Sequence, residues 1–162
     1  MKKLLLAAFT LFVCTTVLHA QEYEEKTITI TPAITGGYGG TVDGYDEGPF
    51  FGGNIRGEYF ASDFYRITLT AGYFNLKLSQ GENVPLYPVL LGVKRHFSEP
   101  FYIGTGLGIT KVGKGGGTAF TYNFNLGFII RQQFDLSLEI QSARGGLDDA
   151  LVLAGLRLGY RF

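Results

Sequence analysis

The last eleven residues alternate strictly between two kinds of side chain, and this pattern constrains the fold more than any other feature. One set is apolar and the other is rich in Gly and Arg: Val152, Ala154, Leu156, Leu158, Tyr160 and Phe162 against Leu153, Gly155, Arg157, Gly159 and Arg161. Successive side chains of a β-strand point to opposite faces, so a period of two predicts a strand with one apolar face. Soluble proteins seldom leave an aromatic such as Phe162 exposed at the tip of a strand.

Residues 1–20 are predicted to be a secretory signal peptide. Two lysines follow Met1, an uncharged apolar run spans Leu4–Leu18, and a polar segment begins after Ala20. This is the layout of an export signal, with cleavage expected near Ala20-Gln21. The run is too short, and flanked by charge on one side only, to be a good membrane-spanning helix.

Removing residues 1–20 from the 162-residue chain leaves 142 residues with no cysteine, 12 Lys or Arg and 14 Asp or Glu. The absence of cysteine excludes a disulfide scaffold, and the net charge of −2 does not suit a nucleic-acid surface. The remaining composition, rich in Gly, Phe, Tyr and Thr, favours strands and turns. We expect a single all-β domain over residues 21–162.

Alternation with a period of two recurs eight times, with turn residues between the segments. About 10 residues per strand suits a tilted crossing of a bilayer. The predicted strands are Thr27–Gly37, Phe50–Phe60, Tyr65–Leu76, Leu86–Phe97, Phe101–Val112, Ala119–Arg131, Phe134–Gln141 and Ala150–Phe162.

The connections also alternate, between short turns and longer segments rich in Gly and Asp. The short turns are residues 61–63, 98–100 and 132–133, and the longer loops are Tyr38–Pro49, Lys77–Pro85, Gly113–Thr118 and Ser142–Asp149. An even number of strands with short turns at one end and loops at the other is the pattern of an up-and-down transmembrane barrel. We expect the long loops to face outside the cell.

Two barrels fit this alternation: a soluble lipocalin-like barrel with an apolar lumen, and a transmembrane barrel with an apolar exterior. Side-chain volume favours the second. The apolar face carries most of the large aromatics, whereas the opposite face carries many glycines, and an eight-stranded barrel has a narrow interior. An aromatic exterior in water would aggregate, so this face should meet lipid.

The charged residues lie on the glycine-rich face of the predicted strands. A lipid-facing Arg or Lys costs roughly 2–4 kcal/mol at the bilayer midplane, so these residues must point inward. Buried charges must also pair, which predicts a salt-bridged network that closes the lumen. Its predicted members are Arg56, Glu58, Arg66, Lys94, His96, Asp135, Glu139 and Arg157.

Two segments carry a resemblance to a known family. Ala154–Phe162, and Tyr87-Pro88-Val89-Leu90-Leu91-Gly92-Val93-Lys94, are similar to the small eight-stranded outer-membrane barrels of the OmpA/OmpX type. The resemblance implies an outer-membrane location and contact with outer-membrane lipid. We also expect no cofactor and a monomeric barrel. The resemblance further implies that Leu158, Tyr160 and Phe162 form the signal read by the barrel-assembly machinery, after periplasmic chaperones have carried the chain. The family is functionally diverse, so no activity follows from it.

Three motifs could carry chemistry, and each has a simpler explanation. Gly108-x4-Gly113-Lys114 lacks the Ser or Thr and the helix of a phosphate-binding loop. His96 has no evident Ser partner near an outer-leaflet substrate, because Ser98 lies in a short turn. The loop acids could bind Ca²⁺ but lack fixed ligand spacing: Asp43, Asp46, Glu47, Asp148 and Asp149. We expect no catalytic, cofactor or metal site, and no enzyme.

A set of apolar residues is predicted to face inward near the loops: Phe74, Leu76, Leu90, Leu151 and Leu153. They could form a small pocket for an acyl chain or another hydrophobic solute, or they could simply pack the lumen. The favoured function is therefore a structural or surface-interaction barrel. The alternative is a binder or conduit for a small hydrophobic molecule.

Overall fold

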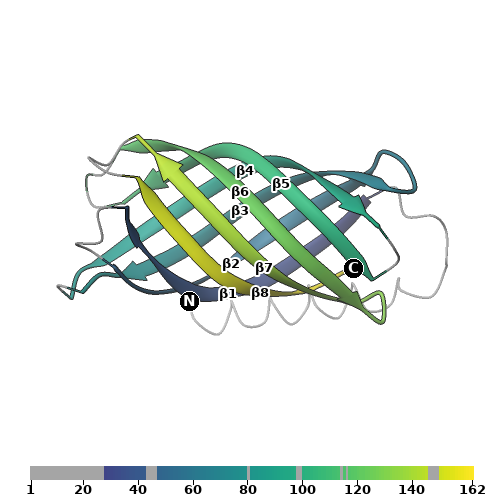
Figure 1. The fold of residues 1–162 in the computed structure, drawn as a ribbon, viewed down its shortest axis with the longest axis horizontal. Coiled ribbons are helices and arrows are strands. Elements are labelled where there is room, and N and C mark those ends of the chain that lie inside the picture. The colour runs from purple at the N-terminus through teal and green to yellow at the C-terminus, as the bar shows by residue number, and fades with distance from the viewer. Residues whose placement is uncertain are drawn as a thin grey trace, which may run out of the picture.

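The computed structural model describes residues 28–42, 47–79, 81–97, 100–113, 115, 117–145 and 150–162. This part of the chain forms eight antiparallel strands that close into one barrel in sequence order (Figure 1). The strands are β1 (Ile28–Thr41), β2 (Glu47–Phe60), β3 (Tyr65–Lys77), β4 (Asn83–His96), β5 (Phe101–Val112), β6 (Thr118–Ile130), β7 (Phe134–Arg144) and β8 (Leu151–Tyr160). The predicted signal peptide and Thr27 lie outside the described residues. None of the described segments is a helix long and apolar enough to cross a membrane.

The two ends of the barrel differ in their connections. Residues 61–64, 97–100 and 131–133 join strands at one end, where β1 begins and β8 ends. We call this the turn end; it lies on the right of Figure 1, as does the carboxyl terminus. Residues 42–46, 78–82, 113–117 and 145–150 join strands at the opposite end, the loop end.

The predicted loop Tyr38–Pro49 is wrong in extent. Its two flanks belong to β1 and β2, with Tyr38 paired to Pro49 and Gly40 paired to Glu47. This part of β1 consists mostly of glycines, so it shows no alternation between polar and apolar side chains. Glycines are required there by close packing against β8, because a Cβ on Gly37 would lie 2.1 Å from the carbonyl oxygen of Ala154.

The strand register fixes the stagger of the barrel. A path across the strands that starts at Thr31 returns to β1 at Thr41, ten residues further along. Such a stagger accompanies the tilt that lets an eight-stranded sheet close, and it leaves an interior that side chains can fill. The path runs through Arg56, Thr70, Leu90, Gly108, Thr121, Ala143 and Leu151.

The two faces of the sheet have the predicted orientation. On β8, Leu156 is 61% exposed on the outside, whereas its neighbour Arg157 is completely buried inside. Outward aromatic residues also pair near both ends of the strands, with ring centroids 5.4 Å apart for Phe134 and Tyr160 and 5.0 Å apart for Phe120 and Tyr122. Two aromatic bands around an apolar belt suit the two interfaces of a bilayer. The lipocalin-like alternative, with a polar exterior, is therefore wrong.

The seam between β1 and β8 is a regular ladder from Ala33 paired with Gly159 to Thr41 paired with Leu151. Beyond the end of β8, the backbone N–H of Phe162 still donates to the carbonyl of Ile30 at 3.0 Å. No edge strand remains in the described barrel, which is the condition for a sheet to lie in hydrocarbon.

Candidate functional site in the barrel interior

The eight residues predicted to form the inward network all point into the barrel, and seven of them are buried. Arg66, near the turn end, is the half-buried member. All eight residues except His96 take part in ion pairs, and Arg161 takes part as well. These residues form seven ion pairs in the described part of the chain. We call this set the interior ion network: Arg56, Glu58, Arg66, Lys94, Asp135, Glu139, Arg157 and Arg161.

Lys94 lies at the centre of the network. Its ammonium group binds Glu58 Oε1 and lies 3.4 Å from Asp135 Oδ2, so it links β2, β4 and β7. It also sits 3.9 Å above the ring of Tyr102, whose hydroxyl donates to Asp135 Oδ1. One ammonium is therefore held by two carboxylates and an aromatic face, which compensates for its removal from water.

Arg157 and Arg56 form the next layer towards the loop end. Arg157 Nη1 lies 3.1 Å from Asp135, and its Nε donates to Asn54 Oδ1 at 3.0 Å. Arg56 Nη2 donates to Glu139 Oε1 at 2.5 Å, while its Nε donates to Thr70. Two of these contacts, Arg157 with Asn54 and Arg56 with Glu139, connect strands that are not neighbours in the sheet, so the layer crosses the interior of the barrel.

A third group of residues lies at the turn end. Arg66 and Arg161 approach the same oxygen, Glu58 Oε2, at 3.7 and 3.9 Å. His96 is 6% exposed, and its ring lies 5.5 Å from the ring of Tyr102. Its Nε2 has no hydrogen-bond partner among the described residues.

Two members of this interior, Tyr102 and Asn54, were not predicted as sites. Tyr102 shares a face with Gly104 and Gly106, and Asn54 shares a face with Arg56, so the alternation contained a signal for both. The aromatic ring of Tyr102 differs from the glycines and charges of that face, and its hydroxyl needs a polar partner when buried. Arg161 continues the inward face of β8 by the same period of two.

Apolar side chains fill the interior at the loop end. The residues Phe50, Phe74, Leu76, Leu86, Val112, Ala119, Ala143, Leu151 and Leu153 pack into one buried cluster, which we call the apolar cluster. It contains four of the five residues predicted for a pocket. Leu90 is buried as well but lies outside the cluster.

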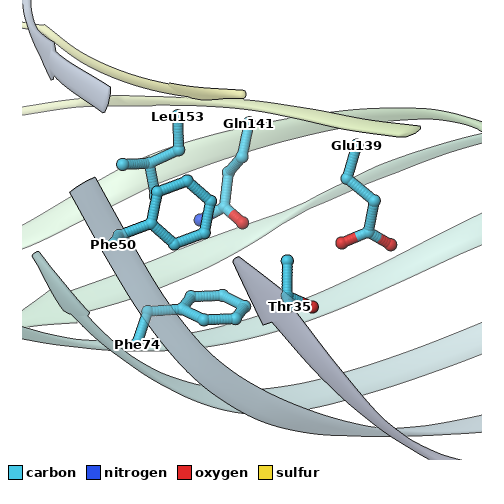
Figure 2. Close-up of a pocket in the computed structure, with 6 residues that line it drawn as sticks. All are labelled: Thr35, Phe50, Phe74, Glu139, Gln141 and Leu153. Atoms are coloured by element: carbon cyan, nitrogen blue, oxygen red, sulfur yellow. The ribbon is translucent and has the colours of Figure 1, made fainter. Parts of the chain in front are cut away.

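A small cavity lies where the apolar cluster meets the polar interior (Figure 2). It has a volume of about 10 Å³, which is room for about one water molecule. Binding a hydrophobic solute there would require side chains to move. The residues that border it are Thr35, Phe50, Phe74, Glu139, Gln141 and Leu153.

The other candidate motifs gain no support as sites. β5 ends at Val112 and the next described element is strand β6, so Gly113 does not begin a helix as a phosphate-binding loop requires. Lys114, Ser98 and the acids Asp43, Asp46, Asp148 and Asp149 lie outside the described residues; Glu47 belongs to β2. Within the described ranges, no group of three or more His, Cys, Asp or Glu could hold a metal ion.

Comparison with known proteins assigns the architecture. No protein-family model and no curated protein sequence matches the chain. Among solved structures, Ail, the attachment invasion locus protein of Yersinia pestis, superposes with a TM-score of 0.62 at 19% identity, over 83% of this chain and 97% of Ail. The chain has the fold of the small outer-membrane β-barrels.

Two further structures show how widely this fold is used. Neisserial surface protein A matches with a TM-score of 0.61 at 13% identity, over 84% of this chain and 96% of its own. The outer-membrane enzyme PagL matches with a TM-score of 0.56 at 11% identity, over 80% of this chain and 97% of its own. Because one of these barrels is an enzyme, the fold alone does not decide whether a barrel is catalytic.

Proposed function

We propose that this protein is an integral outer-membrane barrel with a structural or surface-interaction role, and that the interior ion network closes its lumen. The observation that carries the proposal is the network itself, because its ion pairs join β2, β3, β4, β7 and β8 and the segment after β8 across the interior. A permeating ion would have to separate these pairs, and leaving one buried charge without its partner costs about 3–5 kcal/mol.

The exterior supports insertion into a bilayer. Mid-strand residues such as Leu69, Leu91 and Leu156 are 57–61% exposed, and all are apolar. Monomeric proteins in water rarely expose a continuous apolar surface of this extent. We infer that residues 1–20 are the export signal. We also infer that periplasmic chaperones carry the exported chain, and that the barrel-assembly machinery then reads Leu158, Tyr160 and Phe162.

A non-enzymatic role is supported by the chemistry of the interior. The described residues contain one histidine, His96, and no described hydroxyl donates to its Nε2. A nucleophile needs a base within hydrogen-bond reach, and His96 contacts the ring of Tyr102 instead. PagL shows that the fold can support catalysis, so this part of the proposal rests on the side chains of this chain.

The second candidate function, binding of a small hydrophobic molecule, rests on the apolar cluster at the loop end. The cluster would have to open, because the cavity beside it holds about 10 Å³. Mass spectra of the purified protein test this role directly. A bound lipid that is lost on Leu153→Arg would support it, and spectra free of lipid in the wild type would oppose it.

Surface labelling in whole cells tests the location and orientation. Cys14 is the only cysteine in the sequence, so a cysteine introduced after residue 20 reports one position once the signal peptide has been removed. Glu82 and Asp63 are both exposed acids, at the loop end and the turn end respectively. We expect a membrane-impermeant maleimide to label Glu82→Cys in intact cells and Asp63→Cys only after lysis. The opposite pattern would overturn the orientation, and equal labelling of both would overturn insertion.

A further inference from the structure

The charges of the interior ion network do not balance. Its seven ion pairs involve five cationic side chains and three carboxylates. Lys94, Arg56 and Arg157 each lie within 3.4 Å of a carboxylate oxygen. Among the described residues, the excess positive charge of the network is therefore concentrated on the other two cations, Arg66 and Arg161, at the turn end.

Arg66 and Arg161 lie close together and share one carboxylate oxygen. Arg66 also lies 3.9 Å over the ring of Phe60, and Arg161 Nη1 donates to the backbone carbonyl of Gln132 at 3.5 Å, but neither contact supplies a negative charge. Both guanidinium groups approach Glu58 Oε2, at 3.7 and 3.9 Å, which is beyond hydrogen-bond range. The other oxygen of Glu58 is bound to Lys94. The two guanidinium groups repel each other, so one shared carboxylate oxygen does not satisfy them.

Several nitrogen atoms at this end are buried without a hydrogen-bond partner among the described residues. They are Nε and Nη1 of Arg66, Nε of Arg161 and Nε2 of His96. His96 is more than nine-tenths buried and lies in the field of Arg66, Lys94 and Arg161. A buried polar atom without a partner costs about 1–3 kcal/mol, and more when it carries charge, so three such side chains in one place need an explanation.

We propose that Arg66, Arg161 and His96 form a binding site for a phosphoryl oxyanion at the turn end of the lumen. A phosphoryl group offers three acceptor oxygens and negative charge, which matches the unpaired nitrogen atoms that three side chains place at the turn end. Water could accept hydrogen bonds from these donors but would leave the two positive charges uncompensated. The same chemistry is presented by free phosphate and by the headgroup of a phospholipid.

The site is tested by titrating the folded mature protein while following the His96 imidazole by NMR. In dodecyl maltoside micelles, inorganic phosphate replaces chloride at constant ionic strength. We expect a saturable shift of the His96 signals, with the dissociation constant raised about tenfold or more in Arg66→Gln and in Arg161→Gln. Arg95→Gln is the matched control, because Arg95 lies at the same end but faces outward beside Tyr65 and Phe97.

A second arm distinguishes the two sources of phosphate. Without free phosphate, the His96 signals are compared in nanodiscs of phosphatidylglycerol and of a phosphate-free glycolipid. A shift confined to phosphatidylglycerol and lost in Arg66→Gln would assign the site to a headgroup. The heat-modifiable migration of each variant on gels reports whether it folds. If Arg66→Gln does not fold, Arg66→Lys replaces it in the titration, because it keeps the positive charge but removes the guanidinium donors. No saturable shift in either arm, or equal shifts in Arg66→Gln and Arg95→Gln, would overturn the proposal.

Discussion

Arg56 on β2 and Glu139 on β7 meet inside the barrel, with Arg56 Nη2 2.5 Å from Glu139 Oε1. Eighty-three residues separate them in sequence, and β1 and β8 separate their strands in the sheet. The pair therefore links two walls of the barrel that have no backbone hydrogen bonds in common. Neither side chain could adopt this position if the strand faces were reversed.

The first prediction concerns this pair. Arg56→Met should lower the free energy of unfolding by about 3–5 kcal/mol, because it leaves Glu139 charged and buried with only the more distant Arg157, whose Nε lies 3.8 Å away. The double variant Arg56→Met/Glu139→Leu should recover most of that loss, since no unpaired charge remains. Urea-induced unfolding in lipid vesicles measures both.

The control for this pair is Arg95→Met, which removes an outward arginine and should change stability by no more than about 0.5 kcal/mol. A double variant no more stable than Arg56→Met alone would show that the two residues are not coupled through their charges.

The second prediction concerns Gly127, which lies against the ring of Tyr102. A Cβ at this position would lie 2.0 Å from Tyr102 Cζ, and the ring cannot turn away without breaking its bond to Asp135. Gly127→Ala should therefore destabilise the barrel by about 1–3 kcal/mol. Gly57→Ala, where the nearest atom is 3.9 Å from the added Cβ, should be close to neutral. Equal effects on thermal unfolding would mean that the Tyr102 ring is free to move.

The third prediction separates a lipid-facing exterior from a solvated one. Leu156 and Ile28 are both 61% exposed, but Leu156 lies in the middle of β8 and Ile28 at the start of β1. Leu156→Arg should cost roughly 2–4 kcal/mol in a bilayer, and Ile28→Arg about 0–1 kcal/mol, because the cost of a charge depends on its depth. Similar small costs for the two variants in vesicles would contradict the membrane assignment.

The fourth prediction concerns assembly. The ring of Phe162 makes an edge-to-face contact with Tyr160, and Tyr160 makes one with Phe134, with ring centroids 4.9 and 5.4 Å apart, outside the barrel wall at the turn end. If this segment is a recognition signal, Phe162→Ala should reduce the folded protein in outer membranes while the purified chain still refolds in detergent. Heat-modifiable migration measures the folded fraction in both settings. An equal loss in cells and in detergent would assign Phe162 to stability instead.

Much of this architecture follows from one local rule. Alternation with a period of two places a residue on one of two faces, and the volumes of Gly and Phe decide which face points inward. The inward positions of Glu58, Lys94 and Arg157 were therefore predictable without any knowledge of their partners. The same rule failed where alternate side chains do not differ in size or polarity, as along Gly36, Gly37, Gly39 and Gly40. The extent of β1 was therefore underestimated.

The pairing inside the lumen could not be predicted from the sequence. Which carboxylate meets Arg56 depends on the stagger of the strands, and the stagger is a property of the whole closed sheet. It sets Glu139 rather than Glu58 opposite Arg56 Nη2, and it brings Arg161 to Glu58. Tyr102 was missed for a related reason, because only its neighbours Lys94 and Asp135 explain why an aromatic faces inward.

Single-channel recording in planar lipid bilayers tests the central claim most directly, namely that the interior ion network closes the lumen. The wild-type barrel should show no steady open-channel current. Arg56→Ser/Glu139→Ser, which shortens two side chains that cross the interior, should show discrete conductance steps if it folds, whereas Arg95→Gln should remain silent. A steady open-channel current through the folded wild-type protein would contradict the account.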